Sequence, residues 1–315
     1  MDKPSIFVNP KSGSIKISGE VDRVDVNGNV IESLTNPKLC GCGLSKDKPW
    51  CDSSHGEYVK IVAQQLRNAR ELVKPSNLFG ATPVRAREIR ENELKYRLEH
   101  EEVLVGVKLG GALDSTKKDD PTYINIFGYL TDAMQSVDSI KTASLIYPRA
   151  EAEVVFKLSK EINGEIHPSE VLDYVSHVAA GMEILDYRFG EVEAYAEDCI
   201  ADNAGAAAFA YGAWVPAHQE NLDALTAEVF VNGALTQSSP LTAIQGNPWM
   251  AVVELSKVLA ATGVKLAAGS IIFSGSATTG VPMVAGNSYR VEIKGLGNGN
   301  GRRAWCAAAN PDLRS

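Results

Sequence analysis

Three of the five cysteines in this 315-residue chain lie close together, with a histidine, near its N-terminal end. Their order is Cys40, one residue, Cys42, eight residues, Cys51, three residues and His55. Three thiolates and one imidazole can hold zinc or an iron–sulfur cluster. The ligand types and their spacing therefore predict a metal centre, and by themselves they leave both metals open.

Carboxylates form the second group of residues that could do chemistry. Glu151 and Glu153 are two apart on an apparent strand, so both side chains should point to one face. Adjacent carboxylates repel each other unless a cation neutralises them, and oxygen ligands favour magnesium, manganese or calcium. Glu183 is a third candidate because it lies in an otherwise apolar run. For the first pair alone, a solvated strand face is the simpler interpretation.

Lys108 is the candidate basic residue. It lies within "LVGVKLGGAL", and this apolar, glycine-rich setting favours a buried functional lysine over an ordinary surface one. The two remaining cysteines, Cys199 and Cys306, lie far from the cluster, and we expect them to be core thiols.

The elements that would position these residues differ along the chain. The first 55 residues alternate like short strands, and Asn27-Gly28 is typical of a type I′ hairpin. Such a small β-rich module has a thin core, which a metal centre would stabilise. We therefore expect a first domain over residues 1–56 and a second over 57–315.

The second region mixes helical and strand-like patterns. Apolar residues at steps of three and four predict a helix from residue 57 that continues through Val73 and stops at Pro75. Further helices are predicted over 82–100 and 248–263, and Asn232-Gly233 marks another hairpin. Strand-like runs separate these helices, so the fold class predicted is α+β, with a β-rich main domain.

Composition limits the class of protein. The net charge of −8 argues against nucleic acid as a partner. No apolar run approaches the roughly 20 residues of a membrane span, and the N-terminus does not resemble a signal peptide. We expect a cytoplasmic protein with no membrane partner. In a reducing compartment, clustered cysteines favour a metal over disulfides.

The full cysteine pattern is C-x-C-x2-S-x3-P-x-C-D-x-S-H, which closely resembles the CDGSH iron–sulfur family. This resemblance implies a [2Fe–2S] cluster held by Cys40, Cys42, Cys51 and His55. Ser53 stands where the family usually has glycine, so we expect an unusual backbone angle there.

Four strings of the second region occur in a characteristic order: "PRAEAEVVFKL", "MEILDYRF", "EDCIADNAGAAAFAYG" and "SGSATTGVPMVAGNSYRVEIKGLG". Together they resemble the fumarylacetoacetate hydrolase superfamily, and more closely its 2-oxopent-4-enoate hydratase and 4-oxalocrotonate decarboxylase branch, over about residues 57–296. The resemblance implies Mg²⁺ or Mn²⁺ held by Glu151, Glu153 and Glu183, with Lys108 as a catalytic residue. It also implies a homo-oligomer and a small-molecule 2-oxo acid substrate.

Two departures bear on the reaction. Hydratases of this branch carry an acidic residue where this chain has Ile126, and they tend to have serine where it has Gly205. Hydration needs a group that positions water, so we favour decarboxylation of a 2-oxo-3-enedioate resembling 4-oxalocrotonate. A hydratase or C–C hydrolase on the same scaffold is one alternative. Another is a redox or cluster-sensing protein, with an unidentified redox partner, whose second domain only binds a ligand.

Overall fold

The structure is a computed structural model of the chain. Two of the expected cluster ligands, Cys42 and Cys51, lie outside the residues that it describes. The described residues are 3–8, 14–41, 44–50, 52–78, 82–111, 125–136, 139–140, 142–192, 194–297 and 302–308.

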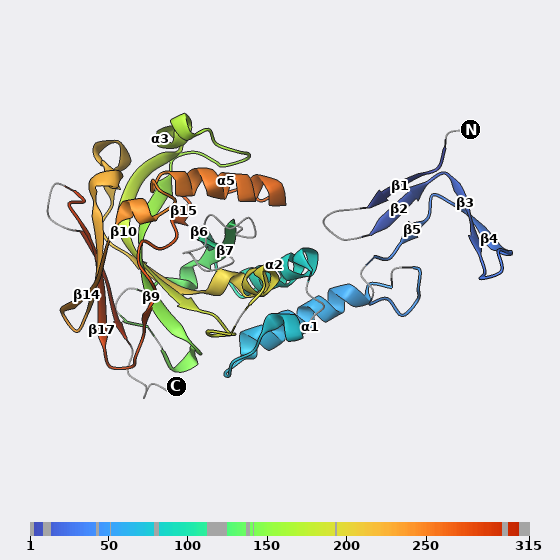
Figure 1. The fold of residues 1–315 in the computed structure, drawn as a ribbon, viewed down its shortest axis with the longest axis horizontal. Helices are drawn as coiled ribbons and strands as arrows, with labels where there is room; N and C mark the ends of the chain where they lie inside the picture. Colours follow the sequence, from blue (N-terminus) through green and yellow to red (C-terminus); the bar gives the residue numbers. More distant parts are fainter. Residues whose placement is uncertain are drawn as a thin grey trace.

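The N-terminal part forms two small antiparallel sheets. One consists of β1 (Ser5–Val8), β2 (Ile15–Ser18) and β5 (Lys38–Leu39), and the other of β3 (Glu20–Val24) and β4 (Val30–Thr35). Figure 1 shows these strands apart from the larger sheets, with helix α1 (Ser54–Asn68) between the two groups. The predicted small β-rich module is therefore present.

The two predicted hairpins use different turns. Asn232 and Gly233 have φ of 51° and 81°, and together they form the loop between the paired residues Val231 and Ala234, as a two-residue type I′ turn requires. Gly28 also has a positive φ, of 85°, but Asn27 does not. The Asp25 side chain instead accepts hydrogen bonds from the backbone N–H groups of Asn27 and Asn29. The first hairpin is confirmed, and its predicted turn type is wrong.

Two larger sheets build the main body. The strand order of the first is β11-β10-β9-β15-β6-β7, with β12 beside β10 and β16 beside β9. Its strands are β6 (Leu104–Gly111), β7 (Asn125–Thr131), β9 (Pro148–Leu158), β10 (Val175–Asp186), β11 (Ala206–Tyr211), β12 (Val215–Pro216), β15 (Ile271–Phe273) and β16 (Val281–Pro282).

The second sheet has the order β14-β13-β17-β18-β8. Its strands are β8 (Ser139–Ile140), β13 (Thr226–Val231), β14 (Ala234–Pro240), β17 (Ser288–Lys294) and β18 (Arg302–Ala308). One large apolar core joins residues of both sheets with those of α5 (Met250–Thr262), so the sheets and this helix bury each other's apolar sides (Figure 1). The strand β18, beyond the glycine-rich segment, was not predicted from the sequence.

A second apolar cluster joins the helices to the other face of the first sheet. It combines the buried residues of α1, α2 (Pro83–Glu99) and α4 (Ala196–Ala201) with Ile126 and Ala204. Because this cluster includes a residue of β7, the helices cover the sheet near the strand that lies beside Lys108. The short helix α3 (Val171–Tyr174) leads into β10.

The helix boundaries follow from local chemistry. Thr82 caps α2 by accepting a hydrogen bond from the Arg85 N–H, and Gly263 ends α5 with a left-handed φ of 71°, as predicted. The first helix stops earlier than predicted, because Ala69 has an extended ψ of 137°. The Val73 N–H, which the longer helix would use, donates to the Arg188 carbonyl at 2.7 Å.

The predicted α+β class is confirmed by this mixture of sheets and helices. Among the described residues, no helix combines the length and the apolar character that a membrane crossing requires.

Candidate functional site

The register of two neighbouring strands brings the three predicted carboxylates together. In the antiparallel pair β9–β10, Glu151 lies opposite Glu183, and Glu153 lies opposite Gly181. Side chains two apart on a strand share a face, so all three glutamates project from one side of the sheet. One carboxylate oxygen from each lies within 4.8 Å of the others. Glu151 and Glu153 therefore do not form a solvated strand face; with Glu183 they form a compact carboxylate triad.

Lys108 reaches this triad from β6. The short strand β15 separates β9 from β6, and its Phe273 is in register with Val155 on one side and with Lys108 on the other. The lysine Nζ lies 3.1 Å from Glu183 Oε1, and only 2% of the residue is exposed. The expectation that Lys108 is buried is confirmed.

The triad has more buried negative charge than its protein partners neutralise. Glu153 Oε2 accepts a hydrogen bond from the Gly275 N–H at 2.9 Å. Glu153 Oε1 and Glu183 Oε2 are buried without a hydrogen-bond partner among the described residues. Unpaired buried carboxylate oxygens are costly, and a divalent cation would satisfy them. Because every donor atom is a carboxylate oxygen, the set fits magnesium, manganese or calcium.

Protonation follows from the same burial. Burial and the charge of Glu183 raise the pKa of Glu151 to about 7, and burial with both neighbouring glutamates raises the pKa of Glu153 well above its usual value. Burial lowers the pKa of Lys108, but the three carboxylates outweigh this and hold it above the ordinary lysine value. The lysine is therefore a cation at neutral pH, whereas the triad without a metal retains protons.

Two glycines leave space around these groups. A Cβ on Gly280 would lie 3.2 Å from Glu151 Oε1, and a Cβ on Gly110 would lie 3.4 Å from the Lys108 Nζ. Ile126 is opposite Gly110 in the β6–β7 register, and it is 2% exposed. The position at which hydratases of this branch carry an acidic residue is thus occupied here by a buried isoleucine, on the strand next to that of Lys108.

Tyr187 is near enough to the triad for the charges of Glu151 and Glu183 to act on its phenol, and it contacts Gly205. Tyr187 directly follows β10, and the Tyr187 ring lies against Gly205, where a Cβ would come within 2.8 Å of the ring. Nothing in the spacing of the charged residues points to this tyrosine. Its position four residues after Glu183, beyond the end of the same strand, is the available sequence signal.

The cysteine module is described in part. Cys40 follows β5, and His55 is the second residue of α1. Ser53, just before this helix, has a left-handed φ of 68°, so the unusual backbone angle expected there is confirmed. Asp52 accepts hydrogen bonds from the N–H groups of Ser54 and Lys46, which hold its pKa well below the usual range.

The other cysteines are distant from this module in sequence. Cys199 is buried in the helical cluster, as expected, and burial raises the pKa of its thiol to about 12. A thiol with such a pKa is a poor nucleophile. The backbone of Cys306 lies on β18, and its side chain is outside the described part of the structure.

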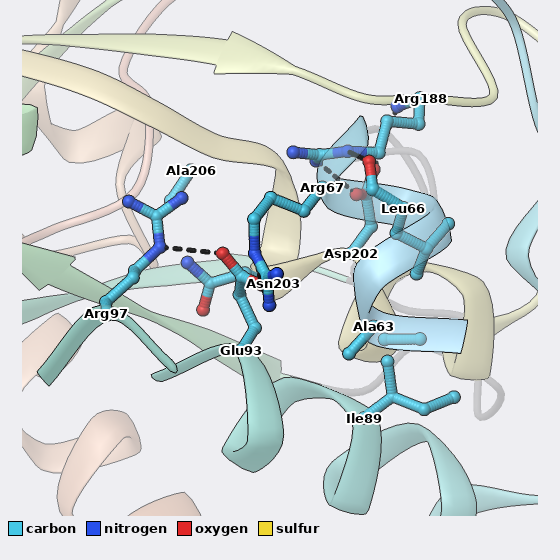
Figure 2. A pocket seen from close by; sticks show the side chains of 11 residues that line it. Ala63, Leu66, Arg67, Ile89, Glu93, Arg97, Arg188, Asp202, Asn203 and Ala206 are labelled. Carbon is cyan, nitrogen blue, oxygen red and sulfur yellow. Dashed lines mark hydrogen bonds and ion pairs between the residues drawn. The ribbon is translucent and has the colours of Figure 1, made fainter. Parts of the chain in front are cut away.

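A small pocket has none of the three glutamates in its lining. It opens where α1, α2 and the segment after α4 meet, and three guanidinium groups and two carboxylates line it (Figure 2). Glu93 pairs with Arg67 and Arg97, and Arg188 pairs with Asp202. Each arginine already has a carboxylate partner, so we interpret this pocket as an ion-pair network that fixes the helices to the segment after α4.

Comparison with protein families gives two matches. Residues 82–302 match the family described as fumarylacetoacetate (FAA) hydrolase C-terminal. Residues 12–56 match the iron-binding zinc finger of CDGSH type. Both resemblances stated from the motifs are confirmed by these matches.

Similar curated proteins have two activities. A 4-oxalocrotonate decarboxylase of Pseudomonas sp is 32% identical over 248 residues, covering 76% of this chain and 96% of that protein. A 2-hydroxyhexa-2,4-dienoate hydratase of Comamonas testosteroni is 34% identical over 248 residues, covering 74% and 91%. The similarity therefore does not distinguish decarboxylation from hydration.

A solved structure has the same fold. The 4-oxalocrotonate decarboxylase from Pseudomonas putida G7, complexed with magnesium and adipate, aligns with a TM-score of 0.72 and 21% identity. The alignment covers 82% of this chain and 98% of that one. At this identity the likeness concerns the fold alone.

Proposed function

Because the chain belongs to the fumarylacetoacetate hydrolase family, we propose that it is a divalent-metal-dependent lyase that decarboxylates a 2-oxo-3-enedioate. The observation that carries the proposal is the triad of the half-buried Glu151 and the buried Glu153 and Glu183 beside the protonated Lys108. Its unpaired oxygens need a cation, and its lysine supplies a positive charge next to that cation's position.

The three glutamates are the proposed ligands of Mg²⁺ or Mn²⁺. Such an ion would supply a Lewis acid at the 1-carboxylate and 2-oxo end of the substrate and would draw electrons toward that end. The chain's own contribution is to hold three carboxylates on two paired strands, so that their geometry is set before the ligand arrives.

Lys108 is the proposed catalytic residue. In a 2-oxo-3-enedioate, the distal carboxylate is vinylogous to that of a β-keto acid. When its C–C bond breaks, carbon dioxide leaves and the electron pair is delocalised along the conjugated carbons to the 2-oxygen. The Lys108 ammonium donates a hydrogen bond or a proton to this oxygen, and the product is the 2-hydroxydienoate.

Ile126 favours this reaction over hydration. It places an apolar side chain beside Gly110, near the lysine, where an acidic side chain would attract water. A carboxylate loses its hydration shell in such surroundings, and its conversion to neutral carbon dioxide becomes easier.

The N-terminal module is proposed to be auxiliary. We assign Cys40, Cys42, Cys51 and His55 as the ligands of a [2Fe–2S] cluster, supported by the family match over residues 12–56. Four protein ligands leave no open position for a substrate on the cluster. We propose domains over 1–56 and 57–315, although α1 begins before this boundary. A homo-oligomer is also proposed.

Hydration is the second candidate function. The 34% identical relative from Comamonas testosteroni is a hydratase, so the scaffold is shared with that reaction. The two reactions differ in product: a hydratase adds water to a dienoate and releases no carbon dioxide.

The test is an assay of the purified chain with a 2-oxo-3-enedioate and added Mg²⁺. We expect one carbon dioxide per substrate consumed and a 2-hydroxydienoate product, identified by NMR. Removing Mg²⁺ with a chelator should abolish turnover. Addition of water to the dienoate without carbon dioxide release would establish the hydratase instead, and Mg²⁺ binding without turnover would favour a non-catalytic domain.

Glu153→Gln tests the site itself. The change keeps the shape of the side chain and removes one ligand charge, so Mg²⁺ affinity should fall at least about tenfold, and turnover should fall with it. Glu161→Gln, at an exposed position just after the same strand, is the matched control and should change neither quantity. Unchanged Mg²⁺ affinity in Glu153→Gln would rule out the assignment.

A further inference from the structure

Tyr187 occupies the space that a side chain at position 205 would need. Gly205 ends a turn in which Asn203, Ala204 and Gly205 all have left-handed φ, of 53°, 54° and 71°. A Cβ added to Gly205 would lie 2.8 Å from one ring carbon of Tyr187 and 2.9 Å from another, closer than real Cβ contacts. The backbone therefore favours glycine at this position, and the ring leaves no room for a larger residue.

The turn is fixed on its Tyr187 side by Asp202. This carboxylate accepts a hydrogen bond from the Arg188 backbone N–H at 2.8 Å through Oδ2, and its Oδ1 pairs with the Arg188 guanidinium (Figure 2). Arg188 in turn donates from Nε to the Leu66 carbonyl of α1 at 2.8 Å. Tyr187 and Gly205 are thus held against each other by their immediate chain neighbours.

The same turn is fixed on the lysine side by Asn203. The Asn203 amide oxygen accepts a hydrogen bond from the Tyr129 N–H at 2.8 Å, and its amide nitrogen donates to the Tyr129 carbonyl at 3.0 Å. The neighbouring Gly128 is in register with Lys108, and a Cβ on it would lie 2.2 Å from the Asn203 carbonyl oxygen. The turn therefore bridges the strand beside Lys108 and the end of the strand that carries Glu183.

Neither the Tyr187 ring nor Asp202, which holds the turn against it, is suited to activate water. Burial raises the pKa of the Tyr187 phenol well above its ordinary value, and the nearby carboxylates of Glu151 and Glu183 add to this, so the phenol remains protonated. Asp202 has both oxygens engaged by Arg188. Neither side chain can act as the general base that addition of water needs.

Resting on the proposed lyase function, we propose that the Tyr187 ring over Gly205 is a specificity determinant of the site. The ring, stacked on Phe189 with 4.8 Å between the ring centroids, fills the space that a serine side chain at position 205 would need, so no hydroxyl at that position can hold water. Loss of carbon dioxide turns the tetrahedral carbon that carried the leaving carboxylate into a planar one and needs no water, whereas hydration needs a positioned water molecule and creates a tetrahedral carbon. The pair therefore favours decarboxylation.

Four variants and one control test this pair. Gly205→Ser should lower Tm, because it meets the ring as well as requiring a left-handed backbone. Gly233→Ser is the control, since Gly233 has φ of 81° with no atom within 4 Å of its Cβ position. It requires the same backbone without the collision and should lower Tm less. Adding Tyr187→Ser to Gly205→Ser removes the ring and should restore much of the lost Tm.

Product analysis then separates specificity from packing. In the double variant and in Tyr187→Ser alone, the hydrated product should make up a fraction of total product at least about tenfold larger than in the wild type. The affinity for Mg²⁺–oxalate should stay the same. Tyr187→Phe keeps the ring, so its product ratio should remain that of the wild type.

A wild-type product ratio in both Tyr187→Ser and the double variant, with Mg²⁺–oxalate still bound, would overturn the proposal and leave the lyase assignment intact. A raised hydrated share in Tyr187→Phe would overturn it too, since the hydroxyl rather than the ring would then matter. Absence of turnover in the wild type would remove the proposed function, and this inference with it.

Discussion

Four residues carry the chemistry proposed for this protein, and their environment explains why. Glu151, Glu153 and Glu183 are packed together where water cannot solvate all of their oxygens. One lysine cannot balance three carboxylates, so protons or a dication must do so. This imbalance distinguishes a ligand site from a structural ion pair, in which the charges cancel.

Metal binding should therefore compete with protons. Because the pKa of Glu151 is raised to about 7 and that of Glu153 is raised as well, Mg²⁺ affinity should rise as the pH rises from 6 through 7. Calorimetry in buffers of different ionisation enthalpy should show proton release on binding at pH 6, and less at pH 8. Equal affinity at both pH values, with no proton release, would contradict this.

The same shift affects the stability of the metal-free protein. The folded-state pKa of Glu151 lies above its unfolded value, so between about pH 4.5 and 7 the folded state holds the proton more tightly. This group's contribution to stability is therefore lost as the pH rises through that window. Saturating Mg²⁺ should reverse the loss, which thermal unfolding with and without the ion at pH 5 and pH 7.5 would measure.

Lys108→Met should separate charge stabilisation from metal binding. Without the ammonium, turnover should fall about a hundredfold or more, because the charge that develops on the substrate oxygen loses its donor. Mg²⁺ affinity should not fall, since a neighbouring cation no longer repels the ion. Lys160→Met, at an exposed position, is the control. Weaker Mg²⁺ binding in Lys108→Met would mean that the lysine organises the triad instead.

At the scale of residues, the sequence is informative where functional side chains are closely spaced or have a distinctive local setting. The E-x-E pair on a strand is sufficient to predict a shared face, and the apolar setting of Lys108 is sufficient to predict its burial. Tyr187 could not be predicted in the same way. Its importance depends on a contact with Gly205, eighteen residues further along, which only the folded chain creates.

At the scale of elements, the site depends on strand register and on one turn. A shift of the β9–β10 register by one residue would turn Glu151 and Glu183 to opposite faces. The turn at Asn203–Gly205 is equally specific, because its left-handed residues persist only while Asp202 and Asn203 fix them from both sides.

Asn203→Ala should destabilise this turn. It removes both hydrogen bonds to Tyr129 and leaves buried backbone groups without partners, so the free energy of unfolding should fall by about 2–3 kcal/mol. Chemical denaturation measures this change. Asn287→Ala is the control: it removes one side-chain hydrogen bond at the surface and should cost less than about 1 kcal/mol. Similar losses in both variants would contradict a special role for the turn.

Element types were easier to predict than their ends. Amphipathic spacing identifies α1, but Val73 fits the same spacing and is not helical, because its N–H bonds to Arg188. For the two Asn-Gly pairs as well, the sequence predicts the element but not its detailed geometry. Both mark hairpins, and only Asn232-Gly233 forms the two-residue turn, since the Asp25 side chain stabilises a longer loop in the other hairpin.

At the scale of the whole molecule, α1 connects the two chemistries. The helix begins beside His55, and its Leu66 carbonyl accepts a hydrogen bond from Arg188, next to Tyr187. The sequence predicts both domains because each has its own motif. It does not predict how they meet, because that depends on which apolar residues of α1 pack against α2 and α4.

Cys40→Ser in the full chain should show that the cluster is auxiliary. The wild type should be red-brown, with about two irons per chain, and the variant should lose colour and iron. Turnover of a 2-oxo-3-enedioate with added Mg²⁺ should stay near that of the wild type. Loss of turnover in a variant that still folds, assembles and binds Mg²⁺ would mean that the cluster takes part in the reaction.

The most direct test of the central claim is a crystal structure with Mg²⁺ and oxalate, which mimics the chelating end of the enolate. We expect one ion bound to oxygens of Glu151, Glu153 and Glu183 at about 2.0–2.1 Å, with oxalate and water completing its octahedral coordination and Lys108 donating to an oxalate oxygen. An ion bound away from these three glutamates, with the triad still free of metal at saturating Mg²⁺, would contradict the account.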